Sequence, residues 1–255
     1  MIPKSIWLAE SFVTCQAKPQ NNLLMKNKIV LDEITDNSRY IDLAGYATAV
    51  TVTGTYKGDR IVFKNASKKL IDFVDVHIHC TRTEPDGDAL VFADTLTDCN
   101  ITGSNCHIQY GGLTFWGKLE NVTISGLDIF HANTGIRASG DFANKNVTIT
   151  NCSIVSAKRE GIYLGPSYLQ KVRSEGIEIY ENYILCSGWD SIQTNGGCKI
   201  HHNRIHYPAT LEEEEQDYAI TIQAGSVAFV WDNVIHSAKK EIQALDCRYF
   251  NHEPK

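Results

Sequence analysis

Two carboxylates, Glu160 and Asp190, stand two residues before the central isoleucine of two consecutive short segments, GIYL and SIQT. If these segments stack as neighbouring strands, the two positions lie about 4.8 Å apart. The pair then fits the acid and the nucleophile of a retaining glycosidase, which need about 5–5.5 Å between them. It also fits a pair of oxygen ligands for Ca²⁺. The third possibility is a pair of turn residues that are neutralised by Lys158 or Arg159 and do no chemistry.

Polar and aromatic residues accompany this pair in the same segments. We expect them on the outer surface, where they would form a shallow groove for an extended glycan. An indole offers a platform for a sugar ring, and the amides can bond its hydroxyls. An arginine can neutralise a uronate carboxylate. The predicted substrate-binding residues are Trp189, Tyr163, Gln193, Asn195 and Gln223, and the predicted catalytic residues are Glu160, Asp190, Arg137 and Arg159.

The sequence predicts no dedicated metal centre. It contains no CxxC motif, and its densest histidines are His201, His202 and His206. Successive strand residues face opposite ways, so these imidazoles converge poorly on one ion. The one cofactor that the pattern admits is Ca²⁺, at the carboxylate pair.

The segments that must position these residues belong to a unit that occurs five times between residues 121 and 245. The units read NVTISGLDI, NVTITNCSI, GIEIYENYI, GCKIHHNRI and VAFVWDNVI. When positions are counted from the second residue of each printed unit, the eighth position is always isoleucine, at residues 129, 154, 184, 205 and 235, and a second short segment follows each unit. Fixed columns with a variable period predict a solenoid of stacked coils, with insertions confined to the turns. The alternative, a β-sandwich, gives no reason for the same columns to recur.

Two earlier segments, IDFVDVHI and ITGSNCHI, extend the pattern towards the N-terminus. We therefore predict an all-β solenoid of seven to eight coils at residues 45–245, preceded by an N-terminal cap at 1–44 and followed by a C-terminal tail at 246–255. The sixth position holds Asn182, Asn203 and Asn233 in the last three units. Stacked asparagines of this kind are expected to hydrogen-bond from coil to coil.

These columns resemble the right-handed parallel β-helix of the pectate-lyase-like superfamily, over roughly Gly45 to Leu245. The segment CSGWDSIQTNGGCKIHHNRI is most similar to bacterial repeat proteins with GWDGIQ-type coils. The resemblance implies a single-stranded, right-handed parallel β-helix. The superfamily includes polysaccharide lyases, hydrolases, epimerases, phage tailspikes and surface proteins without known activity, so the fold does not fix the function. The NTD, DD, GHG and RIK motifs of polygalacturonases are missing from the sequence, and so is the Asp-rich calcium cluster of pectate lyases.

Composition narrows the choice of partners. The chain has 24 basic and 30 acidic residues and no basic stripe, which argues against nucleic acid. It has no apolar run of about 18 residues, so we expect no membrane-spanning segment. The N-terminal stretch MIPKSIWLAESFVTC is interrupted by Glu10 and is not a clear signal peptide. Cys106, Cys152 and Cys198 fall on inward positions, where free cysteine packs as a small apolar residue.

Two functional hypotheses follow. The first is an extracellular or cell-surface β-helix that binds polysaccharide and, if it is an enzyme, cleaves it as a lyase or a glycoside hydrolase. The second is a non-catalytic structural or adhesive solenoid, such as a surface or virion fibre component, which could form oligomers through its ends.

Overall fold

The structure is a computed structural model that describes residues 26–82, 87–138, 142–165, 172–186, 188–206, 218–223, 227–236, 240–245 and 248–251. Within these residues the chain forms strands β1 to β24 and one short 3₁₀ helix, η1 (Leu43–Gly45). The strand pairs are parallel, from the first coils to the last. No helix among the described residues has the length and apolar character needed to cross a membrane.

The strands form two sheets. The fifteen strands of sheet A are β1 (Lys26–Val30), β2 (Glu33–Ile34), β4 (Tyr46–Gly58), β6 (Leu70–Cys80), β8 (Leu96–Gln109), β10 (Leu119–Phe130), β12 (Lys145–Thr150), β13 (Ser153–Ala157), β15 (Ile177–Tyr180), β16 (Tyr183–Cys186), β18 (Cys198–His201), β19 (Arg204–His206), β21 (Val227–Trp231), β22 (Val234–His236) and β24 (Arg248–Phe250). The nine strands of sheet B are β3 (Arg39–Asp42), β5 (Ile61–Lys64), β7 (Asp88–Phe92), β9 (Gly112–Phe115), β11 (Ile136–Ala138), β14 (Ile162–Leu164), β17 (Ile192–Asn195), β20 (Tyr218–Gln223) and β23 (Lys240–Leu245).

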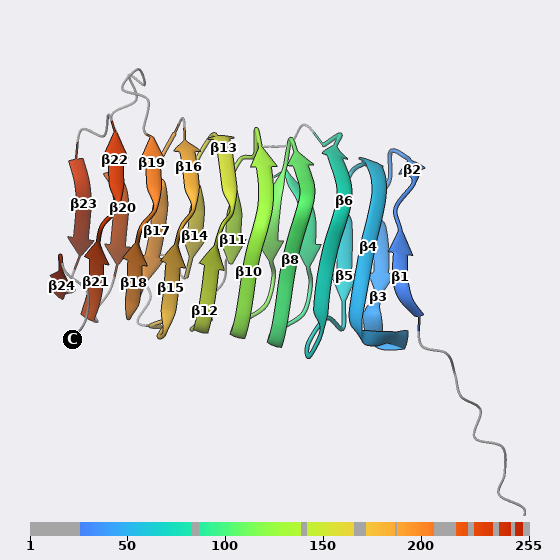
Figure 1. The fold of residues 1–255 in the computed structure, drawn as a ribbon, viewed down its shortest axis with the longest axis horizontal. Coiled ribbons are helices and arrows are strands. Elements are labelled where there is room, and N and C mark those ends of the chain that lie inside the picture. The colour runs from blue at the N-terminus through green and yellow to red at the C-terminus, as the bar shows by residue number, and fades with distance from the viewer. Residues whose placement is uncertain are drawn as a thin grey trace, which may run out of the picture.

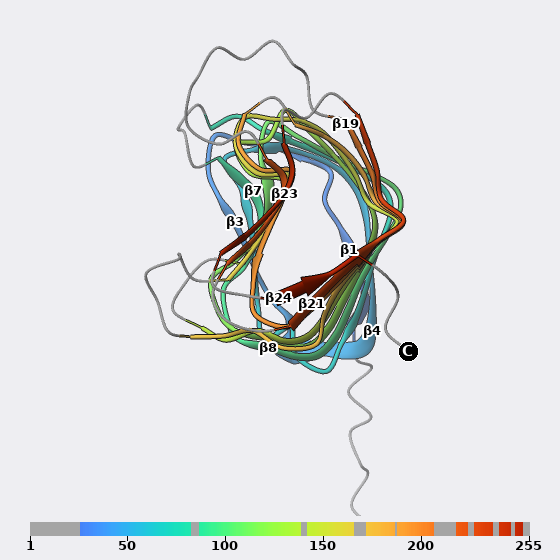
Figure 2. The same ribbon diagram turned by 90° about the vertical axis from the view of Figure 1, so that its left-hand side faces the viewer.

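Each coil runs along sheet A, turns a corner, returns through one strand of sheet B and rises to the next coil (Figure 1). Viewed along the stack, successive coils superpose, with sheet B on one side and sheet A on the other (Figure 2). The predicted all-β solenoid is confirmed. Eight of the nine strands of sheet B lie within residues 45–245, in agreement with the predicted seven to eight coils, and the ninth, β3, precedes them, so the stack begins inside the predicted cap. It includes β1, which pairs with β4 although it precedes residue 45, and β24, which lies in the predicted tail.

The predicted isoleucine row is also confirmed. Ile129 pairs with Ile154, which pairs with Ile184, which pairs with Ile205, which pairs with Ile235. The first four are fully buried and the last is half-buried. One isoleucine per coil therefore forms a continuous apolar stripe, which no single coil could bury alone.

The asparagines of the sixth position form a buried ladder. The Asn203 side-chain oxygen accepts hydrogen bonds from the Asn182 backbone N–H at 3.1 Å and from its side-chain amide at 3.0 Å. The Asn233 oxygen accepts the same two bonds from Asn203, at 3.0 and 2.9 Å. The expected coil-to-coil bonding is thus present, and it satisfies polar groups at a bend that would otherwise be buried without partners.

The three cysteines predicted to face inward are buried, and Cys106 and Cys152 are free thiols. Burial raises the pKa of Cys106 and of Cys152 to about 12, so both are thiols at neutral pH. They act as small apolar side chains inside the stack.

Candidate functional site

The outer face of sheet B carries the row of polar residues that the sequence predicted. Arg137 of β11 lies opposite Tyr163 of β14, Tyr163 lies opposite Gln193 of β17, and Gln193 lies opposite Thr221 of β20. Asn195 lies opposite Gln223 on the same two strands, β17 and β20. The predicted register of these side chains is therefore correct.

The predicted exposure of most of these residues is wrong. A position two residues before an inward isoleucine has the same parity as the isoleucine, so strand alternation does not bring it to the outer surface. Other polar groups bond within the protein; the Asn195 side chain, for example, donates to the Val172 carbonyl at 2.9 Å. The buried members, with their exposed fractions, are Glu160 (4%), Asp190 (0%), Gln193 (7%), Asn195 (1%) and Gln223 (5%).

Arg137 faces a carboxylate of its own chain. Its guanidinium lies 3.4 Å from Asp88, which also accepts a hydrogen bond from Thr114 at 2.5 Å. Arg60 approaches the other oxygen of Asp88 at 4.0 Å. Since Asp88 already opposes the charge of Arg137, this arginine is not poised to neutralise a uronate in the way that the sequence suggested.

Trp189 and Arg159 form an exposed pair beside the buried carboxylates. Trp189 is 38% exposed, and the Arg159 guanidinium lies over its ring at 4.0 Å from the centroid. Arg159 Nε is also 4.0 Å from Glu160. The indole is accessible as predicted, but a cation–π contact already occupies one of its faces.

Glu160 and Asp190 lie in neighbouring coils, as expected; the Gly161 N–H donates to the Asp190 carbonyl at 3.2 Å. Glu160 accepts a hydrogen bond from Thr134 at 3.0 Å. Burial raises the pKa of Asp190 to about 7; the Thr221 hydroxyl opposes this shift, and the negative charge of Glu160 adds to it. Their catalytic roles stay a prediction. A group that transfers a proton must come within about 2.6–3.2 Å of its substrate atom, and both side chains are buried.

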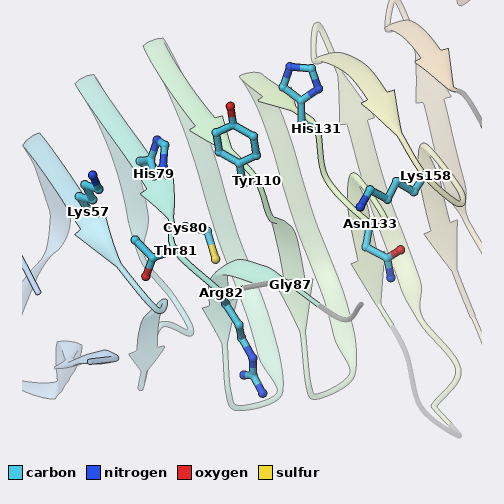
Figure 3. A pocket seen from close by; sticks show the side chains of 10 residues that line it. All are labelled: Lys57, His79, Cys80, Thr81, Arg82, Gly87, Tyr110, His131, Asn133 and Lys158. Atoms are coloured by element: carbon cyan, nitrogen blue, oxygen red, sulfur yellow. The ribbon is translucent and has the colours of Figure 1, made fainter. Parts of the chain in front are cut away.

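A separate groove lies at the corner where sheet A turns towards sheet B (Figure 3). We call it the corner groove. Its volume is about 750 Å³, which is in the range of small-molecule sites. Its lining residues are Lys57, His79, Cys80, Thr81, Arg82, Gly87, Tyr110, His131, Asn133 and Lys158.

Three rings follow one another along this groove, one from each of three consecutive coils. The His79 and Tyr110 ring centroids are 4.9 Å apart, and those of Tyr110 and His131 are 5.6 Å apart. Tyr110 and His131 have left-handed backbones, with φ of 61° and 56°, and the Tyr110 ring is left 48% exposed. The bend thus turns a polar aromatic side chain outward in each coil.

Three cations complete the lining: Lys57 and Arg82 towards the N-terminal coils and Lys158 towards the C-terminal ones. No aspartate or glutamate is among the described residues that line the groove. Arg159 follows Lys158, and its N–H donates to the carbonyl of Asn133, so the exposed Arg159–Trp189 pair continues along the same corner.

The family model described as "right handed beta helix region" matches residues 40–205. The chain belongs to the right-handed β-helix family. No curated protein and no solved structure matches it. Membership fixes the handedness and architecture of the β-helix, while its chemistry must be argued from its own side chains.

The side chains of this β-helix suit binding of an anion more than they suit metal catalysis. Among the described residues, no group of three or more His, Cys, Asp or Glu side chains converges on one point. The corner groove instead offers cationic donors beside exposed rings, an arrangement that can hold a ligand with both negative charge and apolar faces.

Proposed function

We propose that this β-helix binds an acidic polysaccharide along the corner groove, outside the cell or at its surface. One observation carries the proposal: a groove of about 750 Å³ is lined by three cationic side chains and three rings, and no carboxylate is among its described lining residues. Carboxylate or sulfate groups on a glycan would meet the cations, and its sugar rings would meet the aromatic side chains.

The chain as a whole is acidic, so a cluster of cations on its surface is a local feature. The protein carries 24 basic and 30 acidic residues, for a formal charge of −6, so its surface as a whole does not attract anions. A cationic groove on such a protein attracts an anionic chain locally. Arg82 Nε lies 3.9 Å from Asp59, and the planar guanidinium has further N–H groups with which it can bond both oxygens of one carboxylate or sulfate.

The spacing of the lining suits an extended ligand. His79, Tyr110 and His131 come from successive coils, and coils stack at about the spacing of neighbouring strands, about 4.8 Å. A polymer that runs along the stack would meet a new ring or cation at each coil. It would then reach the exposed Arg159–Trp189 pair, which keeps part of the predicted glycan site in the proposal.

The proposal is for binding, because Glu160 and Asp190 are buried and do not line the groove. Cleavage is tested in the same experiment. The purified protein is incubated with polyuronate, sulfated and neutral polysaccharides, and both new unsaturated ends and new reducing ends are followed. Lyase chemistry would produce the first, whereas hydrolysis would produce only the second.

Binding is measured by the retardation of the protein in native gels that contain each polysaccharide. The test variant is the double substitution Arg82→Gln, Lys158→Ala. The control is Lys199→Ala, which removes an exposed lysine from the outer face of sheet A. We expect acidic polysaccharides to retard the parent and the control, and the double variant to migrate freely. Equal retardation by neutral polysaccharides, or unchanged binding by the double variant, would refute the proposal. Single-stranded RNA is tested in the same gels. If it binds more tightly than the acidic polysaccharides, the ligand of the groove is a nucleic acid and not a glycan.

A structural solenoid is the second candidate, and the sheet edges favour it. Among the described strands, β1 at one end of sheet A and β24 at the other pair on one side only. Unpaired edges can add strands from another chain. Light scattering across a range of protein concentrations tests this: growth into larger species supports end-to-end assembly, and a constant mass contradicts it.

A further inference from the structure

Asp190 carries a buried carboxylate that does not line the corner groove and has no role in the proposed binding of glycan. This side chain is fully buried, and neither of its oxygens has a hydrogen-bond partner among the residues that the structure describes. The neighbouring hydroxyls of Ser191 and Thr221 are also buried, and within the same described residues they have no partner. The Thr221 hydroxyl is close enough to lower the pKa of Asp190, but it makes no hydrogen bond of good geometry with it. Four unsatisfied oxygen atoms thus lie at the bend into β17 and on the adjoining strands.

Asp88 shows how the same fold normally handles such a group. Asp88 and Asp190 both stand two residues before an inward residue of sheet B, and each has a threonine in the next coil near its carboxylate. Asp88 accepts a hydrogen bond from its threonine, Thr114, and faces Arg60 at 4.0 Å and Arg137 at 3.4 Å. The charged neighbour that acts on Asp190 is Glu160, which is negative. Asp190 therefore occupies an equivalent place, and no cation of the described part of the chain compensates it as Arg60 and Arg137 compensate Asp88.

An uncompensated buried carboxylate is costly, so such a group is normally paired, coordinated or neutralised by a proton. Buried polar atoms without partners commonly mark a water or an ion. At Asp190, carboxylate and hydroxyl oxygens gather without a hydrogen bond from any described nitrogen donor. A second carboxylate, Glu160, lies in the adjacent coil, and Arg159 Nε is 4.0 Å from it. Oxygen-only ligands in an irregular arrangement suit Ca²⁺, which tolerates variable geometry, better than Mg²⁺, which demands an octahedron.

We propose that Asp190, with Thr221, Ser191 and Glu160, forms an internal site for a hard cation of the Ca²⁺ type. The cation would link the coils of β14, β17 and β20 and would take the place that Arg60 and Arg137 hold at Asp88. Glu160 keeps its bond from Thr134 through one oxygen, which leaves the other oxygen available. The site is separate from the corner groove and does not depend on glycan binding, since none of its members lines that groove.

The first measurement is metal content. The full chain is unfolded in chelator, refolded with either Ca²⁺ or chelator, dialysed, and analysed by mass spectrometry for bound metal. We expect one equivalent of Ca²⁺ per chain in the parent and none in Asp190→Asn. The control is Asp128→Asn, which removes a half-exposed carboxylate from sheet A and should keep the equivalent. Asp190→Asn keeps the side-chain shape, so loss of metal without loss of the circular dichroism spectrum assigns the effect to the charge.

A second readout covers the case in which Asp190→Asn does not fold. Trp189 adjoins Asp190, so Tb³⁺ bound in the parent should emit when tryptophan is excited, and Ca²⁺ should suppress this emission. Trp189→Phe should lose most of the emission while it keeps the Ca²⁺ equivalent. The thermal midpoint of the parent should rise with the logarithm of Ca²⁺ concentration, as for any ligand that binds the folded state.

Two results would overturn the proposal. One is a parent that refolds with no more Ca²⁺ than Asp190→Asn and melts at the same temperature in Ca²⁺ and in chelator. The other is an Asp190→Asn variant that melts higher than the parent in both conditions, which would show that a proton, and not a cation, neutralises Asp190. Equal stabilisation by Mg²⁺ and Na⁺ would contradict the choice of Ca²⁺.

Discussion

The asparagine ladder gives a prediction whose size can be worked from the structure. In Asn203→Ala, the Asn182 backbone N–H and side-chain amide lose their shared acceptor, now at 3.1 and 3.0 Å. The carbonyl of Ile179 loses a donor at 2.9 Å, and the Asn233 oxygen loses another at 2.9 Å. Asn203 is 1% exposed, so water does not readily replace these bonds. Each buried group left unsatisfied costs about 1–3 kcal/mol, and at least two are orphaned, so we expect a loss of about 2–5 kcal/mol in the free energy of unfolding.

The assay is urea unfolding followed by circular dichroism and by tryptophan fluorescence, with coincident transitions as the check that one free energy describes both. Asn233→Ala is the matched control, because Asn233 makes equivalent bonds to Asn203 but is half-buried. The groups it leaves belong to Asn203, and truncation of the half-buried Asn233 side chain opens a path for water to them, so we expect a smaller cost of about 1 kcal/mol. If Asn203→Ala costs no more than the control, the buried asparagine bonds do not hold the coils together.

Three other predictions follow from the same structure. Ile184→Ala deletes a fully buried member of the isoleucine row and should cost about 2–5 kcal/mol in urea unfolding, and a cost below that of an exposed valine such as Val234→Ala would contradict the stack. Without added cation, the free energy of unfolding should fall as the pH rises from about 4 to about 7. The reason is that the pKa of Asp190 is raised from 3.8 to about 7 in the folded protein, so folded Asp190 keeps a proton that the unfolded chain has lost. Thermal melts of Asp190→Asn should not show this pH dependence. Tyr110→Asn removes a groove ring but suits the left-handed φ of 61°, so it should weaken glycan retardation without lowering the melting temperature, and unchanged retardation would exclude the ring from binding.

The fold could be predicted because the same pattern of apolar residues is repeated in each coil of the sequence. The isoleucine columns at residues 129 to 235 repeat once per coil, and parallel stacking turns each column into a buried row. The first coils are less regular in sequence. Strands β1 and β3 carry only Ile29 and Ile41 as buried residues, so the pattern does not separate them from a cap.

The site was predicted less well, for two physical reasons. Alternation predicted the row of Arg137, Tyr163 and Gln193 correctly. Asp190, however, stands two residues before the inward Ile192 and shares its parity, so alternation gave no reason to expect it at the surface, and it is buried. The corner groove also lies at bends. In each of these coils a groove ring follows the buried isoleucine of the eighth position. His79 follows it by one residue, whereas Tyr110 and His131 follow it by two, so the three rings do not fall in one column of the sequence repeat.

The most direct test of the central claim is a crystal structure of the protein with an acidic oligosaccharide. The proposal predicts ligand density in the corner groove, with a sugar ring against Tyr110 and anionic groups next to Arg82 and Lys158. Density confined to the outer face of sheet B, around Tyr163 and Gln193, would contradict the assignment of the groove. Crystals that show no ligand in an open groove at saturating oligosaccharide would contradict the proposed function itself.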